Sequence, residues 1–187
     1  KDNIEKEISH VEHMLSQNNF IAIGEIGLDL YWDKSTLDLQ KIAFESQIKL
    51  AKEHNLPAVI HVRDSFHEAI EIVERLNDDN LSGVFHCFTG NLEEAERIIN
   101  LENFYLGIGG VVTFKNGGIN KIINQVSLDS IILETDSPYL SPTPFRGTRN
   151  ESKYRLNIAA KMADLYNLDI EEIAKKTTEN AIDLFQL

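Results

Sequence analysis

The stretch that decides the fold is Ile131-Ile-Leu-Glu-Thr-Asp136, which is followed at once by Ser137-Pro138-Tyr139. Its apolar, β-favouring residues predict a short strand that runs into two carboxylates and is stopped by proline. Because alternate residues of a strand face the same way, Glu134 and Asp136 are expected to share one face. Asp136 is therefore expected at the end of a strand, where a side chain can leave a packed core and meet a ligand.

Three earlier stretches have the same build, a short apolar run that ends on a potential metal ligand. They are Ile21-Ala-Ile-Gly-Glu25, Pro57-Ala-Val-Ile-His61 and Gly83-Val-Phe-His86. The first is predicted to be a strand over residues 20–25 that leads into a long loop, residues 27–33. Four such runs, each followed by a loop and a helical pattern, predict ligands gathered at strand ends.

Length, charge and cysteine count limit the class of protein. The chain of 187 residues fits one domain, and no run reaches the roughly 18 apolar residues of a membrane span, so no membrane association is expected. The single cysteine, Cys87, cannot form an internal disulfide, which favours a reducing, cytoplasmic location. The net charge of −12 argues against generic nucleic-acid coating but allows a nucleic-acid substrate held locally by metal ions and arginines.

Strand and helix patterns alternate along the whole chain. An apolar stripe predicts a helix over residues 4–17, and a short helix is expected over 119–126. The last third is expected to be helical, with a new helix starting near Thr178. The glycines of Phe104-Tyr-Leu-Gly-Ile-Gly-Gly110 are expected to leave room for a ligand or for backbone. Five β–α repeats predict parallel strands joined by right-handed crossovers.

Two architectures fit this alternation, an open doubly wound sheet and a closed (β/α)8 barrel. Both place functional residues at the carboxyl ends of strands. Ligands on several separate strands converge better when the sheet closes, and the first strand has no Gly-rich phosphate turn before a helix. We therefore predict an α/β fold, a (β/α)8 TIM-type barrel, as one domain over residues 1–187.

Glu25, His61, His86 and Asp136 offer the oxygen and nitrogen donors that suit Mg²⁺, Mn²⁺ or Zn²⁺. Such a site indicates metal-assisted hydrolysis, because a divalent cation acidifies water and stabilises charge on an attacked phosphoryl or carbonyl group. A carboxylate shared by two ions could hold them about 3.5–4 Å apart, a spacing suited to clamping the attacking and leaving oxygens.

The sequence resembles the TatD-type metal-dependent deoxyribonucleases, a family of amidohydrolase-like barrels. The resemblance covers nearly the whole chain from about Ile21, in order and with family-like spacing. It rests on Gly24-Glu-Ile-Gly-Leu-Asp29, Ile60-His-Val-Arg-Asp64, His86-Cys-Phe-Thr-Gly90, Gly107-Ile-Gly-Gly110, Glu134-Thr-Asp-Ser-Pro-Tyr-Leu140, Arg146-Gly147, Arg149-Asn150, Asn180 and Leu184-Phe185.

The resemblance implies a role for each candidate residue. Glu25 would bridge two ions and take part in catalysis, and His61 and His86 would bind one of these ions. Asp136 would bind the other ion and act as the general base for its water. Contacts with substrate phosphates would come from Arg63, Arg146 and Arg149, because guanidinium groups suit phosphate oxygens. A solvated surface position is the alternative for Arg146 and Arg149.

The sequence departs from the family pattern in two places. The family opens with a strand that ends in a His-x-His pair, and this sequence contains no such pair. Since a (β/α)8 barrel runs to about 250 residues, the first one or two β/α units are expected to be missing before Lys1. The stretch Arg146-Gly-Thr-Arg-Asn-Glu-Ser152 stands where the family usually shows a lysine and a proline.

The expected function is that of a divalent-metal-dependent deoxyribonuclease, an exonuclease that cleaves DNA phosphodiesters in the cytoplasm. The full-length protein is expected to bind two metal ions and to need no obligate protein partner. Two other functions remain open: a related barrel hydrolase that acts on an ester, lactone or amide, and a non-catalytic, truncated metal-binding scaffold.

Overall fold

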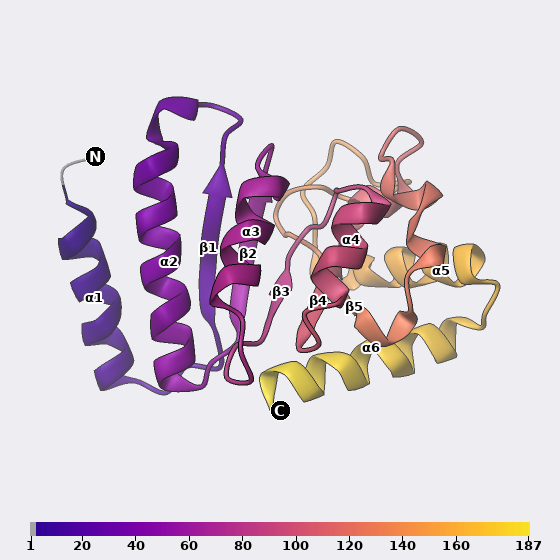
Figure 1. Ribbon diagram of the computed structural model, residues 1–187. Coiled ribbons are helices and arrows are strands. Elements are labelled where there is room, and N and C mark those ends of the chain that lie inside the picture. The colour runs from indigo at the N-terminus through magenta and orange to yellow at the C-terminus, as the bar shows by residue number, and fades with distance from the viewer. Residues whose placement is uncertain (1–2) are drawn as a thin grey trace. The chain divides into compact units, whose positions relative to one another are not determined.

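The computed structural model describes residues 3–187, in which strands and helices alternate along the chain (Figure 1). The strands are β1 (Ile23–Asp29), β2 (Ala58–Arg63), β3 (Gly83–Phe85), β4 (Phe104–Ile108) and β5 (Ile131–Leu133). The α-helices are α1 (Ile4–Gln17), α2 (Leu37–His54), α3 (Phe66–Leu76), α4 (Leu92–Ile99), α5 (Arg155–Tyr166) and α6 (Ile170–Phe185). The chain forms two compact units, one that ends at Val84 and one from Phe85 to Leu187.

In the first unit, β1 and β2 pair in parallel, but β1 is longer than predicted. The register shifts between Ile23 and Ile26, because three residue steps along β1 match only two along β2, from Ala58 to Ile60. The extra residue makes a bulge at Gly24 and Glu25. The prediction that this strand spans residues 20–25 is therefore wrong at both ends, and Glu25 lies inside the strand.

Gly27 lies in the half of β1 that was predicted to be a loop. Glycine usually weakens a strand. In β1 it instead allows a close approach to β2, because a Cβ atom on Gly27 would lie 2.0 Å from the carbonyl oxygen of His61. Beyond it, Leu28 and Leu30 are buried.

The helices of the first unit cover the strands with apolar faces. Phe44, Ile48 and Ala51 of α2 are fully buried, and α2 contacts β1. The predicted helix over residues 4–17 is confirmed as α1, which packs beside α2 (Figure 1). Ile4, Ile8 and Val11 of its apolar stripe line a pocket together with Ala43 and Gln47 of α2.

In the second unit, β4 and β5 pair in parallel, with Leu106 opposite Ile131 and Ile108 opposite Leu133. The helix expected to start near Thr178 is part of one continuous helix, α6. Thr177 does not interrupt it, because its hydroxyl donates to the carbonyl of Ile173 inside the helix.

Residues 119–126 do not form the predicted helix. They form two short 3-10 turns, Ile119–Lys121 and Ile123–Gln125. Tyr166 of α5 holds this segment, since its hydroxyl donates to the carbonyls of Ile123 at 2.5 Å and Val126 at 2.9 Å. Burial raises the pKa of Tyr166, so the phenol stays a neutral donor.

The predicted α/β class with parallel strands is confirmed. The amide of Ala58 donates to Ser82, so the start of β3 lies beside β2, and the amide of Phe88 donates to Gly107, so the chain after β3 lies beside β4. The described residues supply five strands, whereas a closed barrel of this type has eight. Among residues 3–187, none of the helices is both long and apolar enough to span a membrane.

Candidate metal centre

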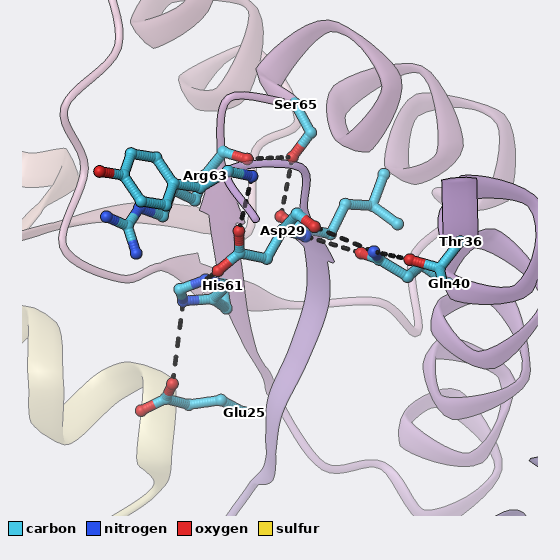
Figure 2. A network of polar contacts seen from close by, with 9 residues as sticks. Glu25, Asp29, Thr36, Gln40, His61, Arg63 and Ser65 are labelled. Carbon is cyan, nitrogen blue, oxygen red and sulfur yellow. Dashed lines mark hydrogen bonds and ion pairs between the residues drawn. The ribbon is translucent and has the colours of Figure 1, made fainter. Parts of the chain in front are cut away.

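Two of the predicted metal ligands lie side by side on the first unit. Nδ1 of His61 is 3.9 Å from Oε2 of Glu25, and Figure 2 shows the imidazole between Glu25 and Asp29. This distance is too long for a hydrogen bond. It suits two donors that share one ion, each at about 2.1 Å from the metal. The bulge in β1 turns Glu25 toward His61, as bulges beside functional sites commonly do.

Asp29 is a site residue that the sequence analysis did not assign. Its Oδ2 lies 3.2 Å from Nε2 of His61. When Nε2 donates its proton to this carboxylate, Nδ1 keeps the lone pair that a metal ion needs. Asp29 thus fixes both the orientation and the tautomer of His61. The signal that could have found it is the alternation of Leu28 and Leu30, which continues the strand past Gly27.

Gln40 of α2 holds Asp29 in place through the backbone. Its Oε1 accepts from the amide of Asp29 at 2.7 Å, and its Nε2 donates to the Asp29 carbonyl at 2.9 Å and to Thr36 at 2.9 Å (Figure 2). Ser65, just after β2, donates to the carbonyl of Leu28 at 2.7 Å. The end of β1 is therefore fixed from both sides.

On the second unit, His86 follows β3 directly and is almost fully buried. Its Nδ1 lies 4.0 Å from Oε2 of Glu134, whose side chain is 22% exposed. Oε1 of Glu134 accepts a 2.6 Å hydrogen bond from the amide of Cys87. Glu134 therefore links the end of β5 to the turn that carries His86, which makes it a positioning carboxylate.

The glycines of β4 make room for Glu134. A Cβ atom on Gly107 would lie 2.8 Å from Oε2 of Glu134 and 2.9 Å from Cα of His86. On Gly109 it would lie 3.4 Å from Oε1, which is an ordinary contact. The room for backbone that the glycines predicted is confirmed at Gly110, where a Cβ atom would lie 2.1 Å from the carbonyl oxygen of Leu140. The space beside Gly107 is shared by Glu134 and by Cα of His86.

Asp136 lies beyond the strand, in a tight turn. Because β5 ends at Leu133, Glu134 and Asp136 are not alternate residues of one strand, and the expected shared face is wrong. Asp136 has a left-handed backbone, with φ of 55°, and its carbonyl accepts from the amide of Tyr139 at 2.8 Å. Aspartate tolerates this conformation better than most residues.

Asn150 holds the turn that carries Asp136, and the sequence analysis gave it no role. The residue is buried. Its Nδ2 donates to the carbonyls of Thr135 at 2.5 Å and Tyr139 at 2.6 Å, on either side of Asp136. Its own amide donates to the carbonyl of Pro138 at 3.0 Å. No local pattern links positions so far apart in the sequence.

The three predicted phosphate contacts differ in their surroundings. Arg63 ends β2, and its guanidinium carbon lies 3.6 Å from the centre of the Tyr31 ring. Arg146 stacks in the same way on Phe114, at 3.5 Å. Arg149 is exposed. Stacking on an aromatic ring leaves the edge N–H groups of a guanidinium available to an anion.

Comparisons with known proteins identify the family. A family model described as "TatD related DNase" matches residues 1–186. The Bacillus subtilis protein called "uncharacterized metal-dependent hydrolase YabD" is 43% identical over all 187 residues, which match 73% of its length. Its Escherichia coli K12 counterpart YcfH, named in the same way, is 34% identical over 97% of this chain and 68% of its own.

A solved structure agrees with this likeness. The crystal structure of YJJV, a TatD homologue from Escherichia coli K12, superposes on this chain with a TM-score of 0.87 and 29% sequence identity. The match covers 98% of this chain and 70% of that protein. The chain therefore belongs to the family of TatD-related DNases and is a metal-dependent hydrolase of that family.

Proposed function

We propose that this protein is a deoxyribonuclease that trims single-stranded or frayed DNA ends with the help of divalent metal ions. The observation that carries the proposal is His61, which is held by Asp29 on one ring nitrogen and has Glu25 beside the other. The family description, which names DNases, supports a phosphodiester as the bond that is cleaved.

The resemblance to the family implies that Glu25, His61 and His86 would hold one ion. One carboxylate and two imidazoles form a donor set that suits Mn²⁺ or Zn²⁺. Asp136, which by the family likeness would bind a second ion, would hold it only weakly with a shared Glu25, because two carboxylates offer few donors. When bound, such ions polarise a phosphoryl oxygen and acidify water.

Asp136 would act as the general base. In the proposed reaction, water attacks phosphorus and one P–O ester bond breaks. The Asp136 carboxylate takes the proton of the attacking water, and the leaving alkoxide gains a proton from solvent. Asn150 would keep this carboxylate in place through the turn on either side of it. Arg63, Arg146 and Arg149 would bind flanking phosphates.

The test is cleavage of an end-labelled, single-stranded oligodeoxynucleotide by the protein with Mg²⁺ or Mn²⁺, with and without EDTA. We expect cleavage that EDTA abolishes and that Asp136→Asn slows by about 10²- to 10⁴-fold, the usual contribution of a general base. Asp164→Asn, an exposed aspartate on α5, is the matched control and should leave the rate unchanged.

Two results would overturn the proposal. One is the absence of EDTA-sensitive cleavage of DNA, and the other is an Asp136→Asn variant as fast as the original. In that case, a parallel panel of carboxylic esters, lactones and amides tests whether the protein hydrolyses a different class of substrate. Metal-dependent turnover of one of these, without DNA cleavage, would assign the same residues to a carbonyl hydrolase.

A further inference from the structure

An aromatic pair stands exposed directly after β1. Trp32 is 82% exposed and Tyr31 is 51% exposed. Their rings meet edge to face, with centres 4.7 Å apart and planes at 88°. Large aromatic rings that remain in water forgo the free energy of burial, so an exposed pair in mutual contact is a candidate binding surface.

Arg63 completes this surface. Its guanidinium lies over the Tyr31 ring at 3.6 Å, and Arg63 follows His61 by two positions on β2, so both side chains leave the same face of the strand. We call Tyr31, Trp32 and Arg63 the aromatic shelf. It presents a flat apolar ring and a planar cation next to each other.

One carboxylate joins the shelf to the candidate metal centre. Oδ1 of Asp29 accepts a 2.9 Å hydrogen bond from the amide of Tyr31, while Oδ2 contacts His61 at 3.2 Å. The residue that orients the metal ligand therefore also fixes the start of the aromatic pair. A group lying on the shelf would be held at a set position relative to the hydrolytic centre.

We infer that the aromatic shelf is a base-stacking subsite for single-stranded DNA, in which a nucleobase lies on Trp32 and Arg63 binds a neighbouring phosphate. The inference rests on the proposed function and deepens it. Every base has a flat face that stacks on an aromatic side chain without regard to sequence. In a duplex these faces are covered, so the shelf selects unpaired ends.

The charge of the protein supports stacking as the source of affinity. With a net charge of −12, the chain lacks the overall basic character that lets many proteins hold DNA by its backbone alone. Local cations and an apolar ring can provide affinity for DNA without an overall positive charge, because stacking is little affected by repulsion between distant charges. The shelf supplies both.

Trp32 is itself the probe, because the chain contains one tryptophan. The titration uses an Asp136→Asn variant in Mg²⁺, so that DNA is bound while its cleavage is strongly slowed. A short single-stranded oligodeoxynucleotide should quench the Trp32 fluorescence to saturation. A fully abasic strand of the same length and charge should not quench it, because it offers phosphates but no bases. Equal quenching by both strands, or by neither, would overturn the inference.

Binding of a dye-labelled oligonucleotide, followed by anisotropy in the same background, tests the residues. Trp32→Ala should weaken binding about 10-fold, whereas Trp32→Phe should keep most of the affinity, since stacking free energies correspond to about that ratio. Phe20→Ala, an exposed aromatic just before β1, is the matched control. Thermal melting confirms that each variant is folded. Unchanged affinity in Trp32→Ala would contradict the shelf.

The two proposals fail separately. If EDTA-sensitive DNA cleavage is present but Trp32 neither responds to bases nor affects affinity, the shelf is wrong and the nuclease stands. If bases quench Trp32 but no DNA is cleaved, the shelf stands as a nucleic-acid-binding site and the nuclease assignment is wrong.

Discussion

His61 is positioned by two carboxylates that both come from the neighbouring strand. Glu25 lies beside Nδ1 and Asp29 beside Nε2. They lie four positions apart, an even spacing that would share one face in a regular strand, but the bulge at Gly24 and Glu25 changes this pattern. The irregularity lies at Glu25, between Ile23 and Ile26, whereas the strand from Ile26 to Asp29 is regular. A local distortion of the backbone therefore accompanies the placement of Glu25 beside His61.

At the scale of single residues, Gly107 is a position where a larger side chain is expected to be poorly tolerated. In Gly107→Ala, the new methyl group would meet both the Glu134 carboxylate and Cα of His86, a backbone atom that cannot move aside. We expect a loss of about 1–3 kcal/mol in unfolding free energy, as for other overpacked sites. Gly109→Ala, where the methyl would make only an ordinary contact, should lose much less. Urea denaturation of the two variants measures the difference, and equal stability would contradict this account.

Residue types and spacing were enough to propose Glu25, His61, His86 and Asp136 as ligands. They were not enough to find Asp29 or Asn150. The contacts that place them in the site reach groups 11 or more positions away, such as Gln40 and His61 for Asp29 and Thr135 and Tyr139 for Asn150. Such pairings depend on how the chain is folded and leave no local pattern.

At the scale of elements, the turn that carries Asp136 depends on Asn150. Asn150→Asp keeps the acceptor used by the amide of Glu151. It replaces the two N–H donors with oxygen, which would face the carbonyls of Thr135 and Tyr139. We expect stability to fall by about 2 kcal/mol, because two buried acceptors lose their donor. Metal-dependent hydrolysis should fall at least 10-fold as the Asp136 turn loosens.

Asn124→Asp is the matched control for this change, since Asn124 is exposed and should tolerate the substitution. Stability is read from denaturant unfolding and the rate from substrate turnover. If Asn150→Asp were as stable and as active as the original chain, the turn would be held by other contacts.

Elements with a strong local signal were predicted well. The apolar stripe over residues 4–17 predicted the bounds of α1. Elements set by tertiary contacts were predicted poorly. The segment over residues 119–126 has helical apolar spacing, but Tyr166 takes two of its carbonyls as partners. β1 extends past its predicted end because Gly27 allows a close approach to β2.

At the scale of the whole molecule, the alternation of strands and helices predicted the α/β class because helix and strand periods differ clearly in sequence. The family likeness extends over the entire chain, and the chain spans 73% of the length of YabD and 68% of that of YcfH. The net charge of −12 fits a protein that binds cations at a carboxylate-rich centre.

The proposed metal centre, to which Glu25 and His61 contribute, is tested most directly by calorimetric titration of the metal-free protein with Mn²⁺. We predict one tight site per chain, because Asp136 with a shared carboxylate offers too few donors for a second. His61→Ala should lower the affinity for Mn²⁺ at least about 10-fold. Loss of a residue that only supports a metal ligand already lowers metal affinity by about that factor, and His61 is itself a proposed ligand. His67→Ala is the matched control, since His67 is an exposed histidine on α3 that pairs with Glu71. A His61→Ala chain that is folded and binds Mn²⁺ with the original stoichiometry and affinity would contradict the account.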